Sequence, residues 1–193
     1  KDAHDKGYET TINLMAISTL LDFDLQEAIE QVAKSEVETL YLVDSFGALY
    51  SEQIQYLAGK YLKAVENTGK QVGIHTHNNQ QLAYANTIEA IIMGVNCLDA
   101  TIYGIGRAAG NCPLELLIGF LKNPKFDLRP IIDVIQNTFI PLREEIEWGY
   151  LIPYAVTGML NQHPKAGMDL RAGEEKDNYL KFYDEQVSST DLD

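Results

Sequence analysis

The chain has few cysteines, few basic residues and no long apolar segment. Its two cysteines, Cys97 and Cys112, lack C-x-x-C spacing, which disfavours a disulfide framework or a structural zinc site and is typical of a reducing cytoplasm. No apolar run approaches the roughly 20 residues that span a bilayer, and no basic-then-apolar signal segment opens the sequence. We therefore expect a cytoplasmic protein that does not enter a membrane.

Basic charge is also scarce. Fifteen lysines and arginines stand against 28 aspartates and glutamates, which gives a formal net charge of −13 at pH 7. A chain this acidic repels phosphate backbones, so we expect no nucleic-acid partner. Residues 174–193 hold seven of the acids and two of the bases, and we expect this acidic tail to be a solvated, frayed terminus.

Strand and helix signals, by contrast, alternate regularly through the first two-thirds of the chain. Apolar or β-rich runs predict strands at Glu9–Ser18, Thr39–Val43, Val72–His77 and Cys97–Tyr103, and amphipathic helical segments follow them. This alternation predicts an α/β fold with parallel strands and right-handed crossovers. Periodicity alone leaves open a small open sheet or half of a (β/α)8 barrel, because a whole barrel takes about 250 residues and eight strands.

Capping residues and glycines predict where the helices begin and end. We expect Asp24 to cap the first helix, with Glu27 completing a capping box. Ser51 should cap the second helix, which Gly69 ends, and a third should span about residues 80–93.

The last third of the chain reads as helical throughout. A helix should begin with Pro113 as its first residue, since proline suits that position. From Lys122 onward we expect only helices, with breaks at four prolines, Pro130, Pro141, Pro153 and Pro164.

Three polar clusters follow the predicted strands. They are D-S-F-G at Asp44–Gly47, H-T-H-N-N at His75–Asn79, and G-I-G-R-A-A-G-N at Gly104–Asn111. In parallel α/β folds the chemistry gathers at the carboxyl ends of the strands. The coincidence therefore predicts a functional site at that end of the sheet.

The H-x-H pair is the most specific of these features. Residues i and i+2 of a strand point to the same side, so His75 and His77 can share one metal ion. Two ligands are too few for a firm site, and a bare H-x-H is more often a pair of packed or hydrogen-bonded histidines. The motif alone leaves both interpretations open.

The other polar candidates each have a structural alternative. Asn111 could ligate a metal or cap the helix that begins at Pro113. Arg107 could clamp a carboxylate or be a solvated loop charge. Asp44 could orient the histidines or cap the following turn. The loop glycines lack the lysine of a phosphate-binding loop, and no histidine lies near Cys112 in sequence.

Two stretches are much more specific together than any single residue. They are G-I-H-T-H-N-N at residues 73–79 and L-D-A-T-I-Y-G-I-G-R-A-A-G-N-C-P-L-E at residues 98–115. From about Lys1 to Phe120 the chain resembles the metal-dependent lyase and synthase family of DRE-type barrels. This family includes 4-hydroxy-2-oxovalerate aldolase, hydroxymethylglutaryl-CoA lyase and 2-isopropylmalate synthase, and the resemblance is closest to the aldolase branch.

The resemblance implies a (β/α)8 TIM barrel of which this chain carries strands five to eight. Residues 1–123 would then be the second half of the barrel, residues 124–173 C-terminal helices packed on it, and residues 174–193 an acidic tail. A half-barrel leaves two open sheet edges, which natural proteins avoid. We therefore expect the piece to associate, either with further strands of the same protein or with a second copy as a homo-oligomer.

The resemblance also implies a metal site. His75 and His77 match the family's two metal-binding histidines, and Asn111 matches an asparagine that is a ligand in some branches. The metal would be Mn²⁺, Mg²⁺ or Zn²⁺. Tyr154 falls where the aldolase branch has a catalytic tyrosine, although a packed aromatic residue is an alternative. Arg107 is the second candidate catalytic residue and also lines the expected pocket, together with Asp44 and Asn79.

The implied activity is cleavage of a carbon–carbon bond in a 2-oxo acid through a metal-stabilised enolate. The family's strand-one arginine and aspartate ligand have no equivalent in this sequence, and the glycine loop lacks the cysteine of the CoA-lyase branch. Two alternatives remain open: a synthase of the isopropylmalate type, and a non-catalytic barrel that serves as a binding or scaffold subunit. An aldehyde-consuming dehydrogenase is a further partner implied by the resemblance alone.

Overall fold

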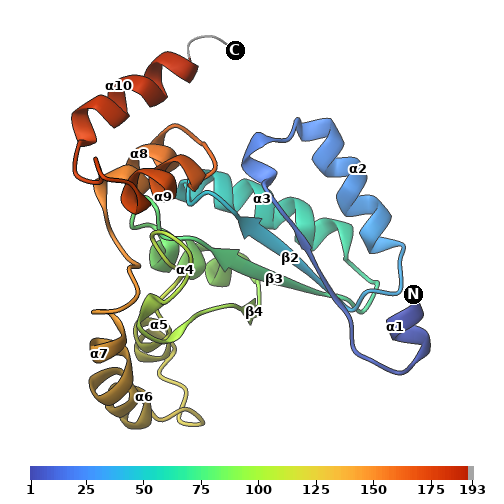
Figure 1. Cartoon of the computed structure of the whole chain (residues 1–193). Coiled ribbons are helices and arrows are strands. Elements are labelled where there is room, and N and C mark those ends of the chain that lie inside the picture. The colour runs from blue at the N-terminus through green and yellow to red at the C-terminus, as the bar shows by residue number, and fades with distance from the viewer. Residues whose placement is uncertain (191–193) are drawn as a thin grey trace. The chain divides into compact units, whose positions relative to one another are not determined.

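Four parallel strands form one sheet in the order in which they occur along the chain (Figure 1). The strands are β1 (Thr11–Leu14), β2 (Thr39–Asp44), β3 (Gln71–Thr76) and β4 (Cys97–Leu98). The computed structural model describes residues 1–190, and these divide into two compact units. The predicted alternation of parallel strands and helices is confirmed.

The sheet unit comprises Lys1–Ser45, Leu49–Thr76 and Ala85–Asp99. Its helices are α1 (Asp2–Asp5), α2 (Asp22–Ala33), α3 (Ser51–Ala64) and most of α4 (Ala83–Met93), together with the 3₁₀ turn η1 (Ile17–Thr19). The core lies between one face of the sheet and helices α2, α3 and α4, where alternate strand residues meet the apolar stripes of α2 and α3. The residues of this core include Leu40, Leu42, Val72, Ile74, Leu25, Ile29, Ile54 and Tyr61.

The helical unit comprises Phe46–Ala48, His77–Tyr84 and the chain from Ala100 onward. Its elements are the turn η2 (Ile102–Gly104), α5 (Leu114–Leu121), α6 (Arg129–Val134), the π-helical turn η3 (Ile135–Phe139), α7 (Ile140–Leu142), α8 (Ile152–Met159), α9 (Lys165–Ala172) and α10 (Tyr179–Thr190). The expectation of helices alone after Lys122 is confirmed for the described residues. The three-part division of the chain made from the sequence stays a prediction.

The fourth strand is shorter than predicted. Asp99 still donates its backbone N–H to the carbonyl oxygen of Ile74 at 3.0 Å. Thr101, however, forms a bridge with Pro113 and takes no part in the sheet. The sequence run to Tyr103 is therefore strand-like only in composition, because its later residues pair with the segment that precedes α5.

Several predicted helix ends are wrong by a few residues. α2 begins at Asp22 with no side-chain cap, so Asp24 lies inside the first turn, where a negative charge is also favourable. α3 begins at Ser51, and Gln53 accepts a hydrogen bond from the N–H of Tyr50, the actual cap residue. α3 ends at Ala64, before the predicted end at Gly69.

The third helix begins later than predicted, and the prolines start helices more than they break them. Gln81 has a positive φ of 62°, and Asn78 Oδ1 accepts the N–H of Ala83 at 3.1 Å, so α4 begins at Ala83. Pro113 precedes α5 as its extended cap residue. Pro130, Pro153 and Pro164 lie at or beside the first turns of α6, α8 and α9, where a missing N–H costs nothing. Pro141 follows the π-helical turn η3 within a continuous helical run from Arg129 to Leu142.

The acidic tail is more ordered than expected. Residues Tyr179–Thr190 form α10, and Phe182 on this helix is buried. Residues 191–193, the end of the predicted tail, lie outside the described residues. No helix among the described residues is long and apolar enough to cross a membrane.

Candidate metal centre

His75 lies on β3, in register with Val43, on the face of the sheet opposite Leu42 and Ile74 of the core. Its Nδ1 lies 3.1 Å from Oδ2 of Asp99, directly after β4. A carboxylate at one ring nitrogen fixes the orientation of the imidazole and raises the basicity of the other nitrogen, as in many metal-binding histidines. His75 is therefore oriented as a ligand would be.

Tyr41 on β2 completes a polar cluster with these two residues. The pKa of Tyr41 is raised to about 12, first by burial and then by the charge of Asp99 and a hydrogen bond to it. Gly73 lies opposite Tyr41 on β3, and a Cβ there would come within 2.5 Å of the ring. A glycine at this position therefore allows the tyrosine ring to lie across the neighbouring strand.

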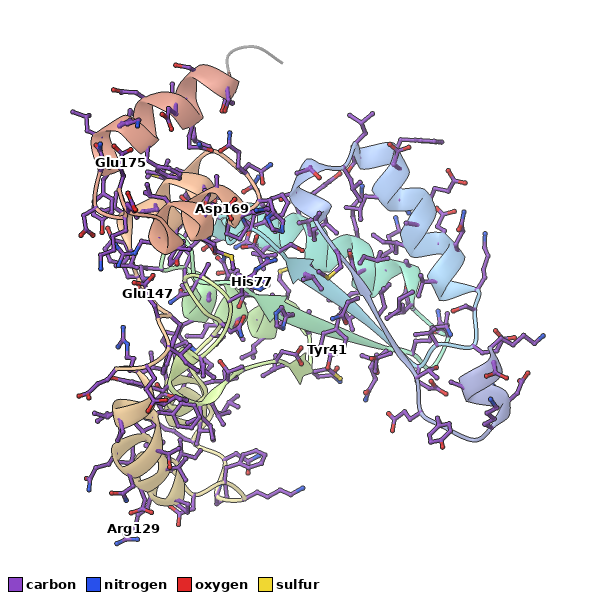
Figure 2. The ribbon with its side chains drawn as sticks, viewed as in Figure 1. Tyr41, His77, Arg129, Glu147, Asp169 and Glu175 are labelled. Carbon is purple, nitrogen blue, oxygen red and sulfur yellow. The ribbon has the colours of Figure 1, made fainter. Side chains whose placement is uncertain are left out.

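His77 is the first residue after β3 and belongs to the helical unit, where Figure 2 labels it. The prediction that it ends the strand is wrong by one residue. Its backbone forms an isolated antiparallel bridge with Asn111, and Asn78 donates its N–H to the carbonyl oxygen of Gly110 at 2.9 Å. Two motifs more than thirty residues apart in sequence thus lie side by side.

Asn111 does not cap α5, so that alternative is wrong. Its Nδ2 donates to the carbonyl oxygen of Ile105 at 3.0 Å. Its Oδ1 is buried and has no hydrogen-bond partner among the described residues. A buried amide oxygen left without a donor is costly, and an amide oxygen is a good ligand for hard divalent cations.

Gly106 packs directly against this amide. A Cβ at Gly106 would lie 2.4 Å from Nδ2 of Asn111 and 3.0 Å from its Cγ. The loop also closes on itself through the N–H of Asn111, which donates to the carbonyl oxygen of Gly104 at 3.0 Å. Glycine at position 106 therefore makes the room in which the Asn111 side chain lies.

The donor set fits a divalent cation. Imidazole nitrogens suit zinc and manganese, and an amide oxygen suits manganese and magnesium. Among the described residues, no group of three or more histidine, cysteine, aspartate or glutamate side chains could hold a metal ion. That His75, His77 and Asn111 belong to one ligand set stays a prediction.

Asp44 and Asn79 have structural partners. Asp44 is buried, and its Oδ2 accepts the N–H of Leu49 at 3.2 Å, which is the turn-capping role foreseen for it. The carboxylate of Asp99 contacts His75. Asn79 is buried and donates from Nδ2 to the carbonyl oxygen of Tyr154 at 3.1 Å. Their roles as pocket residues stay predictions.

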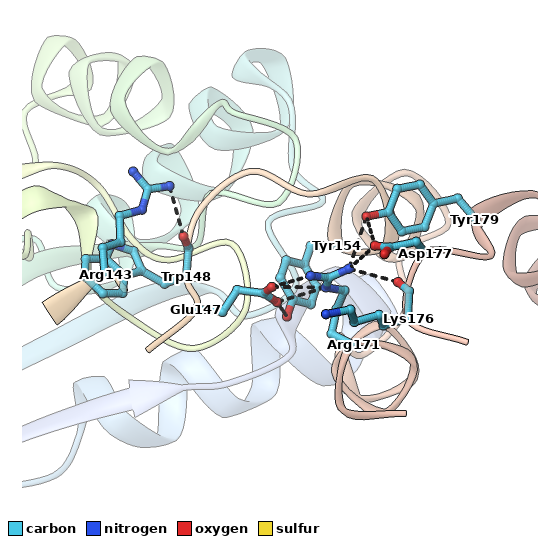
Figure 3. Close-up of polar contacts among 8 residues, drawn as sticks. All are labelled: Arg143, Glu147, Trp148, Tyr154, Arg171, Lys176, Asp177 and Tyr179. Carbon is cyan, nitrogen blue, oxygen red and sulfur yellow. Dashed lines mark hydrogen bonds and ion pairs between the residues drawn. The ribbon is translucent and has the colours of Figure 1, made fainter. Parts of the chain in front are cut away.

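Tyr154 lies in α8 and is buried. Its hydroxyl donates to Oε1 of Glu147 at 3.1 Å, and Glu147 pairs with Arg171 at 2.6 Å (Figure 3). Arg171 also pairs with Asp177 at 2.6 Å. Burial first, and then Glu147, raise the pKa of Tyr154 to about 12, so its hydroxyl is protonated at neutral pH. Its catalytic role stays a prediction.

Arg107 and His163 are both exposed and meet on the helical unit. Nη1 of Arg107 lies 3.1 Å from Nε2 of His163. The ring of Phe46 packs edge-on against His163, with ring centroids 5.7 Å apart. No local sequence pattern indicates this contact, because 56 residues separate the two side chains.

The chain matches the HMGL-like family model over residues 1–137. It is 38% identical over 144 residues to the oxaloacetate decarboxylase of Mycobacterium tuberculosis, which covers 72% of this chain and 41% of that protein. It is 35% identical over 130 residues to the 4-hydroxy-2-oxovalerate aldolase of Thermus thermophilus, which covers 61% of this chain and 37% of that protein.

One solved structure is similar in both sequence and fold. The N-terminal domain of a Bacteroides vulgatus protein named as an aldolase superposes with a TM-score of 0.73 at 32% identity, covering 86% of this chain and 55% of that one. The chain spans about two fifths of the length of the two curated relatives. The fold is α/β, with parallel strands that form part of a (β/α)8 barrel, as expected. With the family model matching more than half of its residues, the chain belongs to the HMGL-like family.

Proposed function

We propose that the protein carrying this chain is a divalent-metal-dependent carbon–carbon lyase that acts on a 2-oxo acid. The observation that carries the proposal is the buried Oδ1 of Asn111, which has no hydrogen-bond partner in the described part of the chain, in a residue whose backbone pairs with His77. The carboxylate on His75 supports it, because Asp99 fixes that ring as it would fix a ligand.

The named substrates of the two curated relatives share one reaction pattern. Oxaloacetate and 4-hydroxy-2-oxovalerate are both 2-oxo acids. Breaking the bond between C3 and C4 of either leaves its electron pair on the enolate of pyruvate. A bound divalent cation would supply the positive charge that stabilises this enolate.

The residues of this chain would have distinct parts in that chemistry. His75, His77 and Asn111 would hold the cation. Asp99 would accept the N–H at Nδ1 of His75, which leaves Nε2 as the ligating nitrogen and fixes the orientation of the ring. Tyr154 would present a protonated hydroxyl, since its pKa of about 12 lies far above neutrality. By the resemblance, a carboxylate ligand and the general base would come from residues outside these 193.

The β1 strand supports association with further strands. Thr11 and Asn13 are exposed, and in the described part of the chain β1 pairs only with β2. An open edge of this kind invites pairing. We propose that another strand of the same protein, or of a second copy, covers it; an aldehyde-consuming dehydrogenase as partner stays a prediction from the resemblance.

The test is metal analysis and pyruvate release with the full-length protein. Purified protein should carry about one divalent cation per chain and release pyruvate from at least one of the two substrates. Asn111→Ala should lower metal affinity by about 10- to 100-fold, whereas the exposed Asn137→Ala should not. A protein that binds no divalent cation, or keeps full activity with His75→Ala, would refute the proposal.

A further inference from the structure

His163 lies between two hydrogen-bond donors. The backbone N–H of Lys165 points to its Nδ1 at 3.1 Å, and the guanidinium of Arg107 lies 3.1 Å from its Nε2. A backbone amide and a guanidinium can only donate. Each ring nitrogen of His163 therefore faces a donor and would have to accept a hydrogen bond.

No protonation state of His163 satisfies both contacts. A neutral imidazole has one nitrogen with a lone pair, and an imidazolium has none. The pKa of His163 is lowered, first by burial and then by the charges of Arg107 and Lys165, which agrees with a neutral ring. In that neutral ring, the nitrogen that carries the proton still faces a donor, so one of the two contacts brings two N–H groups together.

An anionic oxygen bound beside both side chains would remove this conflict. Nδ1 would accept the N–H of Lys165, while the N–H at Nε2 and the guanidinium of Arg107 would both donate to the anion. Arg107 and His163 are exposed, so a small ligand can reach them. The edge-on ring of Phe46 helps to hold the imidazole in place. We propose that Arg107 and His163 form a carboxylate-binding subsite.

The position of Arg107 in the chain connects this subsite to the proposed metal centre. Arg107 follows Gly106, which packs against the side chain of Asn111. Both residues lie in the loop that is closed by the hydrogen bond between Asn111 and Gly104. The inference rests on the proposed function at this point. The first carboxylate of a 2-oxo acid adjoins the carbonyl group at which the enolate forms, so a separate anion site serves a second carboxylate of the substrate.

We expect this second carboxylate to keep its negative charge when the carbon–carbon bond breaks. A carboxylate that leaves as CO₂ loses its charge in the transition state, so a cationic site would stabilise the ground state more and slow the reaction. The favoured substrate is therefore a 4-hydroxy-2-oxo acid with a carboxylate at C4. The C4 hydroxyl loses its proton to a base and becomes the aldehyde of glyoxylate. The C3–C4 electron pair forms pyruvate enolate, which takes a proton at C3.

The binding test uses metal-free, full-length protein with ¹⁵N-labelled histidine. Acetate should bind saturably and shift the His163 resonances to the tautomer protonated at Nε2, and Arg107→Met should abolish the shift. The exposed Arg129→Met is the matched control and should leave the shift intact. No saturable shift with acetate, or tighter binding of inorganic phosphate than of acetate, would overturn the subsite.

The kinetic test compares 4-hydroxy-2-oxoglutarate, which has the second carboxylate, with 4-hydroxy-2-oxovalerate, which lacks it. Arg107→Met and His163→Gln should each raise KM for the first substrate by about 10- to 100-fold more than KM for the second, whereas Arg129→Met should change neither KM by more than about twofold. Equal losses on both substrates would overturn the assignment. A protein that cleaves neither refutes the proposed function, while the acetate titration still decides the subsite.

Discussion

Replacing Gly106 with alanine tests whether the Asn111 amide depends on the missing side chain beneath it. The new Cβ would lie 2.4 Å from Nδ2 of Asn111, about 1 Å closer than ordinary contact. Overpacking of this size costs about 1–3 kcal/mol, and turning the amide away instead loses its bond to Ile105, worth about 1 kcal/mol. The free energy of unfolding should therefore fall by about 1–3 kcal/mol, or Tm by about 2–12 °C for a chain of this length.

The same substitution at Gly119 is a matched control. A Cβ there meets nothing within 4 Å, and the residue lies inside α5. Gly119→Ala should therefore stabilise the protein by up to about 1 kcal/mol. Urea unfolding followed by circular dichroism measures both variants, and calorimetric titration with Mn²⁺ measures whether Gly106→Ala also weakens metal binding.

A double variant separates the clash from the ligand. Removing the Asn111 side chain leaves room for the new Cβ at position 106, so Gly106→Ala combined with Asn111→Ala should be no less stable than Asn111→Ala alone. Metal affinity should stay low in the double variant because the amide oxygen is gone. Additive losses of stability, or wild-type metal affinity in Gly106→Ala, would refute the reasoning.

Three further outcomes are expected. Asp99→Asn should weaken metal binding by about 10- to 100-fold through His75, measured by competition with a chelating dye; unchanged affinity would contradict the role of the carboxylate. Arg171 holds the pKa of Glu147 below its usual 4.5, so this ion pair stabilises the fold fully above that pH and less as the pH falls through the lowered pKa. The difference in unfolding free energy between wild type and Arg171→Met, measured by urea unfolding, should therefore shrink in acid. A difference that stays constant with pH would argue against this contribution. Removing the cation with a chelator should lower Tm, since a ligand at 100 times its Kd stabilises by about 2.7 kcal/mol; an unchanged Tm would count against a metal bound to the folded state.

The central strands were predictable because their sequence signals are local. Apolar runs in β2 and β3 come within one or two residues of the observed bounds, as expected for strands buried in a parallel sheet. β4 was predicted too long because composition cannot reveal that Thr101 pairs with Pro113. The cap at Asp24 failed because a helix can begin earlier without a side-chain cap.

The candidate site was predictable only where a motif carried it. His75, His77, Asn111 and also Asp99 stand in the two specific stretches of sequence, but the sequence does not indicate which of these residues contact one another. Asp99 reaches His75 from 24 residues away in the chain, and no periodicity signals such a contact. His163 was missed for the same reason, and the two donors that face it become visible only in three dimensions.

The order of the sheet has a consequence for how the chain folds. Thr11 pairs with Thr39, Thr39 with Gln71, and Gly73 with Cys97, so each strand meets its successor about thirty residues later. Pairings between segments this near in sequence close short loops, and short loops cost little conformational entropy. The sheet unit can therefore form strand by strand along the chain, before contacts between distant segments are made.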